Sequence, residues 1–126
     1  NSEQIAYTPS CSYAVSLAAK NIYQDMLRKE KDTSWKTAGK KILILEDQMS
    51  SNVYPWQNLT NATDLQLFIV KETEEGDETG LTERIVKALL DTNIAISICA
   101  LPNVHWCSGE VIDLDRIGKI CQDKLG

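Results

Sequence analysis

The sequence has 126 residues, 43% of them hydrophobic and 25% charged, a composition typical of one globular domain. These values argue against a disordered chain, a collagen-like repeat or a coiled coil. The formal net charge of −5 disfavours a general electrostatic attraction to nucleic acid or to an anionic membrane. No stretch approaches the roughly 20 apolar residues that a membrane span needs. We therefore expect neither nucleic acid nor a membrane as a partner.

Four cysteines, at positions 11, 99, 107 and 121, are too widely spaced for a C-x-x-C pair, and the sequence has one histidine. This set lacks the spacing of a zinc site, so no metal site is predicted. Cys99 lies in an apolar run and Cys121 on a helical apolar face, where free buried thiols are common. The first residues also lack the pattern of a signal peptide. These features favour reduced thiols and a cytoplasmic location.

Short apolar runs predict strands that alternate with helical patterns. The runs cover residues 42–45, 65–70 and 94–100, and the shorter run 5–7 is a fourth candidate. Two of them are nearly continuous and rich in β-branched side chains, which is typical of parallel strands covered on both faces. The sequence therefore predicts buried strands rather than strands with one solvated face.

Three helical patterns lie between or after these runs. Residues from about 12 to 30 place apolar side chains on one face, and residues 81–89 follow the i, i+4, i+7, i+8 rule. The last helix is predicted to begin at Asp113, which has the side chain of an N-cap. This alternation predicts an α/β domain in three layers, with a mostly parallel sheet between flanking helices.

In open α/β sheets, ligands bind beyond the carboxyl ends of the strands. The segment Thr8–Tyr13 is a predicted strand-to-helix turn rich in hydroxyl side chains. Its amide groups and the helix dipole favour an anion, to which Ser10 or Ser12 adds a hydroxyl donor. Serine at a helix start is equally typical of a simple cap. Taken alone, the segment fits either a phosphate site or a cap.

Two further polar segments follow predicted strands. Residues 46–56 carry Met49 and several aromatic side chains, for which packing against a neighbour is the simplest interpretation. Residues 101–110 place His105 two positions before Cys107, as in a nucleophilic pair. No third residue is evident to orient the histidine, which disfavours that interpretation.

In their order and spacing, these segments resemble the large cofactor-binding domain of class V aminotransferases, a family of pyridoxal-phosphate enzymes that includes cysteine desulfurases and isopenicillin-N-epimerase-like proteins. Residues 5–14 resemble the strand, turn and helix that hold the cofactor phosphate. Residues 42–56, which end in Asn-Val-Tyr-Pro-Trp, resemble the strand and loop that carry the ring-stacking side chain. Residues 104–109, followed by 112–114, resemble the third signature. The resemblance covers residues 5–125.

The resemblance implies where pyridoxal 5'-phosphate is bound. Ser10, Cys11 and Ser12 fall at the phosphate turn, with Ser12 in the place of the usual threonine. The ring-stacking position, often histidine or another aromatic in the family, falls on Met49 or Ser50. A thioether packs against a ring but stacks less specifically than an aromatic side chain.

The resemblance also indicates what is different or missing. Trp106 stands near the cofactor, at the position where desulfurases have an asparagine beside its phenolic oxygen. The aspartate that pairs with the pyridinium nitrogen and the lysine that forms the Schiff base come on later strands in the family, and no lysine of this sequence has a matching context. Residues 1–126 are therefore predicted to be part of the large domain, without a second domain and inert alone.

The implied complete enzyme acts on an amino acid by transfer, epimerisation or C–S cleavage, and family members are generally homodimers. The alternative from the residues is a non-catalytic α/β binding or interaction module with a degenerate phosphate turn. A flavodoxin-like or nucleotide-binding domain is less consistent with the sequence, because Thr8–Ser12 has no glycine.

Overall fold

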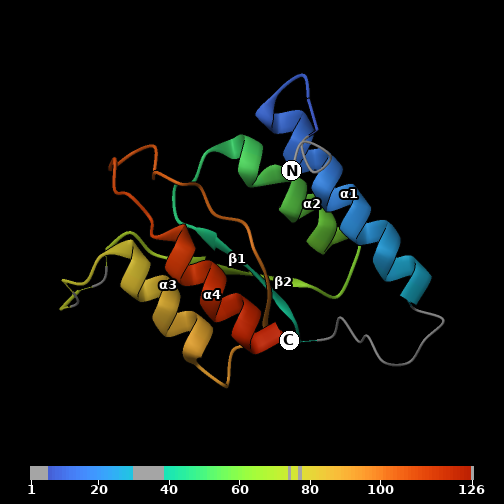
Figure 1. Ribbon diagram of the computed structural model, residues 1–126. Helices are drawn as coiled ribbons and strands as arrows, with labels where there is room; N and C mark the ends of the chain where they lie inside the picture. Colours follow the sequence, from blue (N-terminus) through green and yellow to red (C-terminus); the bar gives the residue numbers. More distant parts are fainter. Residues whose placement is uncertain (1–5, 30–38, 74, 77, 126) are drawn as a thin grey trace.

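The computed structural model describes residues 6–29, 39–73, 75–76 and 78–125 (Figure 1). In chain order its elements are α1 (Cys11–Lys29), β1 (Lys41–Leu45), the short 3₁₀ helix η2 (Ser50–Asn52), α2 (Tyr54–Asn61), β2 (Gln66–Val70), α3 (Leu81–Leu90), β3 (Ile96–Cys99) and α4 (Leu114–Leu125). Within this described part of the chain, no helix is both long and apolar enough to cross a membrane.

The three strands form a parallel sheet in the order β2-β1-β3. The β1–β2 register runs without interruption from the pair Lys41–Gln66 to the pair Leu45–Val70. The β1–β3 register shifts by one residue between Lys41 and Ile42. The predicted α/β class and parallel sheet are confirmed, and β1 is the central strand.

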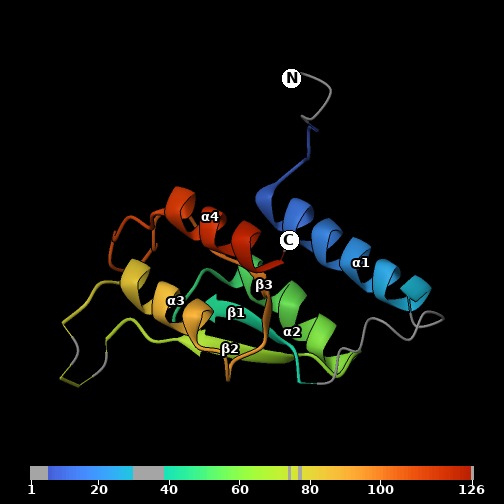
Figure 2. The ribbon, with the colours of Figure 1, turned by 60° about the horizontal axis from the view of Figure 1, so that its bottom comes forward.

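Side chains of β1 alternate between the two faces of the sheet, as the two-residue period of a strand requires. Ile42 and Ile44 pack with Trp56 and other residues of α1 and α2. Leu43 and Leu45 pack on the opposite face with residues of α3 and α4. All four β1 side chains are at most 2% exposed, and each such burial contributes roughly 1.5–3 kcal/mol. Helices therefore cover both faces of the sheet (Figure 2).

The ends of α3 and α4 are held together by polar contacts. The Asp113 carboxylate accepts the backbone N–H of Arg116 at 2.9 Å, which confirms Asp113 as the N-cap of α4. The Arg116 guanidinium pairs with the Glu83 carboxylate of α3 through both terminal nitrogens. At the other end of the pair, the Lys124 ammonium donates to the carbonyl of Leu89. These contacts fix α4 alongside α3.

Two sequence predictions about strands are wrong. In the run 5–7, the described residues Ala6 and Tyr7 are not in a strand and Tyr7 is fully exposed, while Ile5 lies outside the described residues. A strand needs a neighbour for its backbone hydrogen bonds. Residues 6–7 pair with none of the strands of the described sheet, whose edges are β2 and β3. The runs 65–70 and 94–100 are also less buried than predicted, with Ile69 on β2 52% exposed. Their positions at the sheet edges explain this.

The Glu83–Arg116 pair gives a pH-dependent contribution to stability. The hydrogen bond from Arg116 lowers the pKa of the Glu83 carboxyl below its usual value of 4.5. A lowered carboxyl pKa stabilises the fold above the unfolded-state pKa, and the contribution is lost as the pH falls through the folded-state pKa. Glu83→Gln is therefore expected to lower the midpoint of thermal unfolding at pH 7, and the difference from the wild type is expected to shrink below about pH 4.5 and disappear in stronger acid.

Circular dichroism melts from pH 2.5 to pH 7 measure this difference. Glu75→Gln, which removes the same charge from another exposed position, is the matched control. A difference between the wild type and Glu83→Gln that does not change with pH would contradict the ion-pair explanation.

Candidate functional site

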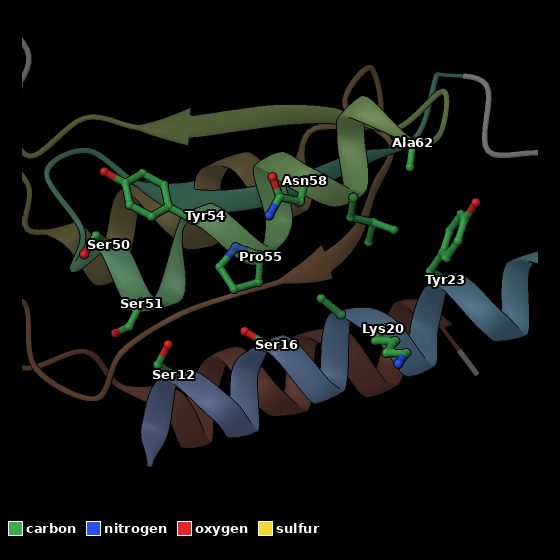
Figure 3. A pocket seen from close by; sticks show the side chains of 12 residues that line it. Ser12, Ser16, Lys20, Tyr23, Ser50, Ser51, Tyr54, Pro55, Asn58 and Ala62 are labelled. Atoms are coloured by element: carbon green, nitrogen blue, oxygen red, sulfur yellow. The ribbon is translucent and has the colours of Figure 1, made fainter. Parts of the chain in front are cut away.

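A groove lies between the first half of α1 and the segment formed by η2 and α2 (Figure 3). Its volume is about 450 Å³. Its walls are rich in hydroxyl and amide groups, and the lining residues are Ser12, Ser16, Ala19, Lys20, Tyr23, Ser50, Ser51, Tyr54, Pro55, Asn58, Leu59 and Ala62. Ser12 and Ser51 lie close together at the end of the groove where α1 begins, and Tyr23 and Ala62 lie toward the other end (Figure 3).

The start of α1 has a conventional cap. The Ser10 hydroxyl accepts the backbone N–H of Tyr13 at 3.1 Å, and the Thr8 hydroxyl donates to the Ser10 carbonyl at 3.4 Å. Ser10 therefore already caps the helix, as the simpler interpretation predicts. Cys11 is an exposed free thiol that does not line the groove, whereas Ser12 does. Of the predicted phosphate turn, Ser12 alone reaches the groove.

A buried glutamine holds the carboxyl end of the sheet together. Gln48 is 7% exposed, and its side-chain oxygen accepts the backbone N–H of Leu45 at 3.1 Å. Its amide nitrogen donates to the carbonyls of Ala100 and Asn52, at 2.9 and 3.0 Å. One side chain thus joins the ends of β1 and β3 to η2. The sequence alone does not identify Gln48, because no local pattern marks a glutamine whose partner is 52 residues away.

The beginning of α2 is fixed by a second side-chain contact. The Trp56 indole N–H donates to the Asn52 side-chain oxygen at 3.1 Å, and Trp56 is 5% exposed. The packing interpretation is therefore confirmed for Trp56. Tyr54 is 62% exposed at the groove, and Met49, immediately before η2, is 53% exposed. Met49 consequently does not fill a gap in the core.

His105 is the most buried residue of the loop after β3, with no exposed surface. Its Nε2 lies 3.0 Å from the Glu46 carbonyl and its Nδ1 lies 3.0 Å from the Ser108 hydroxyl. Because a carbonyl only accepts, Nε2 carries a proton and donates to Glu46. Cys107 is exposed, with its sulfur 3.8 Å from the Asp47 carbonyl. Both ring nitrogens of His105 are thus engaged in holding the loop, which agrees with the sequence argument against a Cys107–His105 nucleophilic pair.

Trp106 belongs to the loop after β3 and contacts the turn that follows β1. Its indole N–H donates to the Asp47 carbonyl, yet 64% of the residue is exposed. Asp47 has a positive φ of 49°, a conformation that aspartate tolerates better than most residues. Because Met49 is two residues further along, the turn brings Trp106 and Met49 to the same edge of the sheet. Neither of them lines the groove.

Comparison with known proteins assigns the chain to a family. The model of the class V aminotransferase family matches residues 1–126, the whole sequence. The chain belongs to this family. Its members are in general enzymes that depend on pyridoxal phosphate, and the resemblance deduced from the three segments is therefore confirmed.

A curated relative supports the same assignment. The chain is similar to a probable cysteine desulfurase from Borreliella burgdorferi (strain ATCC 35210 / DSM 4680 / CIP 102532 / B31), at 27% identity over 122 residues. The match covers 97% of this chain but 26% of that protein. The chain therefore spans about a quarter of the relative's length.

The described residues fit one end of pyridoxal phosphate better than the other. The start of α1, with the Ser12 hydroxyl facing Ser50 and Ser51, has the donor chemistry that a phosphate requires. Met49 and Trp106, which do not line the groove, are exposed side chains of the kind that can contact a planar ring. Lys20 also lines the groove, two turns along α1.

Gln48 provides a test of how the site is held. Gln48→Ala removes three hydrogen bonds and leaves the Leu45 N–H and the Ala100 carbonyl without this partner. We expect a loss of about 3 kcal/mol in the free energy of unfolding, measured by chemical denaturation. Gln57→Ala, on the exposed side of α2, is the control and should change it by less than about 0.5 kcal/mol. Equal losses for the two variants would contradict the bridging role.

Proposed function

We propose that residues 1–126 are part of the large cofactor-binding domain of a pyridoxal-phosphate-dependent enzyme that acts on an amino acid. The observation that carries the proposal is the position of Ser12. It lies in the first turn of α1, beside the two serines that follow the central strand, at the edge where α/β folds bind ligands. Family membership supports the cofactor, and the groove supports where its phosphate binds.

The phosphate end of the site is formed by the chain's own groups. A helix leaves its first backbone N–H groups without a partner in a preceding turn; in α1 the Ser10 hydroxyl accepts that of Tyr13, and the helix dipole favours an anion beside those of Cys11 and Ser12. In this proposal the Ser12 hydroxyl donates to a phosphate oxygen, while Ser10 keeps its capping bond and orients the turn. Cys11 is adjacent and contributes its backbone N–H.

The ring end of the site is formed by Met49 and Trp106. Both side chains are exposed, and the bond from Trp106 to the Asp47 carbonyl restrains the indole. When bound, the cofactor serves as the electron sink for the reaction of an amino acid. The protein's part is to hold the pyridine ring against these side chains and to exclude water from its face.

The type of reaction is inferred from the family, from the curated relative and from Trp106. Transfer, epimerisation and C–S cleavage are all consistent with the family, and the curated relative is a probable cysteine desulfurase. Trp106, in place of the asparagine that desulfurases carry, favours one of the other two reactions.

We also propose that the complete enzyme is a homodimer. All four cysteines are free thiols, which supports a reducing compartment such as the cytoplasm.

The role of Ser12 can be tested in the full-length protein. Ser12→Ala removes one hydrogen bond to a charged group, so the dissociation constant of pyridoxal phosphate should rise about tenfold or more, measured by isothermal titration. Ser16→Ala lies one turn further along the same groove and should change the constant less than twofold. Unchanged affinity in Ser12→Ala would contradict the assigned phosphate site. Circular dichroism melts show whether both variants remain folded.

The predicted inertness of this part of the domain can be tested separately. The 126-residue chain, incubated with pyridoxal phosphate and then reduced with borohydride, should show no lysine carrying the cofactor at stoichiometric yield in peptide mass spectra. It should also leave an amino acid substrate unchanged, because it lacks the family's Schiff-base lysine. A stoichiometric adduct at one lysine together with turnover would show that these residues are sufficient for catalysis, against the proposal.

A further inference from the structure

Two cysteines from distant parts of the sequence meet away from the proposed cofactor site. Cys99 ends β3 and Cys121 lies on α4, and their sulfur atoms are 4.0 Å apart. Both residues are half-buried, whereas Cys11 and Cys107 are exposed. The apolar surroundings and the neighbouring thiol therefore distinguish the Cys99–Cys121 pair from the other two cysteines.

A second cavity, of about 290 Å³, adjoins the pair. It lies along β3, the edge strand of the described sheet, and Cys99, Cys121 and Lys124 contribute to its wall. The Lys124 ammonium is held there by its bond to the Leu89 carbonyl. The cavity is large enough to hold a small oxidant, since one water molecule needs only about 10–15 Å³ of such volume.

We propose that Cys99 and Cys121 are a redox-active dithiol that a peroxide converts into a disulfide between β3 and α4. The sulfurs need to approach from 4.0 Å to about 2.0 Å, a change that side-chain rotation and a small shift of α4 provide. Cys121 lies near the end of that helix, in its second-last turn, where a local displacement needs the least free energy.

The chemistry balances with hydrogen peroxide as the oxidant. The Cys121 thiolate attacks one peroxide oxygen, the O–O bond breaks, and hydroxide leaves and takes up a proton to become water. The Cys99 sulfur then attacks the sulfur of the resulting sulfenic acid, the S–O bond breaks, and the departing hydroxide takes up the Cys99 thiol proton and leaves as a second water. Each sulfur loses one electron and the two peroxide oxygens gain two. Burial raises the pKa of the Cys99 thiol to about 12, which disfavours Cys99 as the thiolate that attacks the peroxide.

The disulfide has a structural consequence for the loop after β3. It links the two ends of residues 100–120, the segment that carries buried His105 and exposed Trp106. Closing a loop of this length restricts the unfolded chain more than the folded one. The oxidised protein is therefore more stable, and this loop is more rigid than in the reduced state.

The experiment treats the full protein with a small excess of hydrogen peroxide, then blocks the remaining thiols and digests the product with trypsin. Because no lysine or arginine lies between Ala88 and Asp115, Cys99 and Cys107 share one tryptic peptide. The Cys107→Ser variant removes this ambiguity and serves as the background. We expect a peptide that joins Cys99 to Cys121 with the loss of two hydrogens, and a rise of about 5 °C or more in the midpoint of thermal unfolding that a thiol reductant reverses.

Two matched variants in the same background separate this pair from general oxidation. Cys99→Ser and Cys121→Ser should each lose the joined peptide and the thermal shift, with Cys121→Ala as a second variant if the serine disturbs the helix. Oxidation of Cys11 alone, a disulfide between two molecules, or sulfinic acid at Cys121 without the joined peptide would each overturn the proposal. Pyridoxal-phosphate binding does not enter the readout.

Discussion

The side-chain amide of Gln48 is the contact on which the arrangement of the candidate site depends. Parallel strands end at the same edge of a sheet, where their last backbone groups lose the ladder partners that the strand interior has. Gln48 satisfies one such group on β1 and one on the segment that follows β3, and it also bonds to η2. Because η2 and α2 form one wall of the groove, this buried amide sets the position of Ser50 and Ser51 relative to α1.

A second set of contacts fixes the loop after β3 to the turn after β1. His105 donates to Glu46 from a fully buried position, and Trp106 donates to the next carbonyl, that of Asp47. The buried imidazole ring of His105 thus anchors the loop at this edge of the sheet. The same bonds leave the indole of Trp106 exposed but oriented, which is the combination that a ligand-contacting ring requires.

Much of the fold follows from local patterns in the sequence. The apolar run 42–45 predicts the central strand, and the periodicity of residues 81–89 predicts α3. Asp113 predicts the start of α4 because an N-cap bond joins residues three apart. The strand predictions fail where the pairing of strands determines the structure. Residues 6–7 have the side chains of a strand but no neighbouring strand in the described sheet. The run 65–70 lies at a sheet edge, where Ile69 is left half-exposed. Burial on both faces depends on strand order, which no local pattern contains.

For the site, the sequence by itself determined the family, because three ordered segments and their spacing are properties of the chain. It also identified Ser10, Cys11, Ser12, Met49 and Trp106 as candidates. The tertiary structure decided that Ser10 caps α1 while Ser12 faces the groove, and that His105 and Cys107 are not a catalytic pair. It also revealed Gln48 and the Cys99–Cys121 pair. The Ser10 cap is a local contact between residues three apart. The contacts of Gln48, His105 and the Cys99–Cys121 pair join positions 22 to 59 residues apart, which only packing across the sheet brings together.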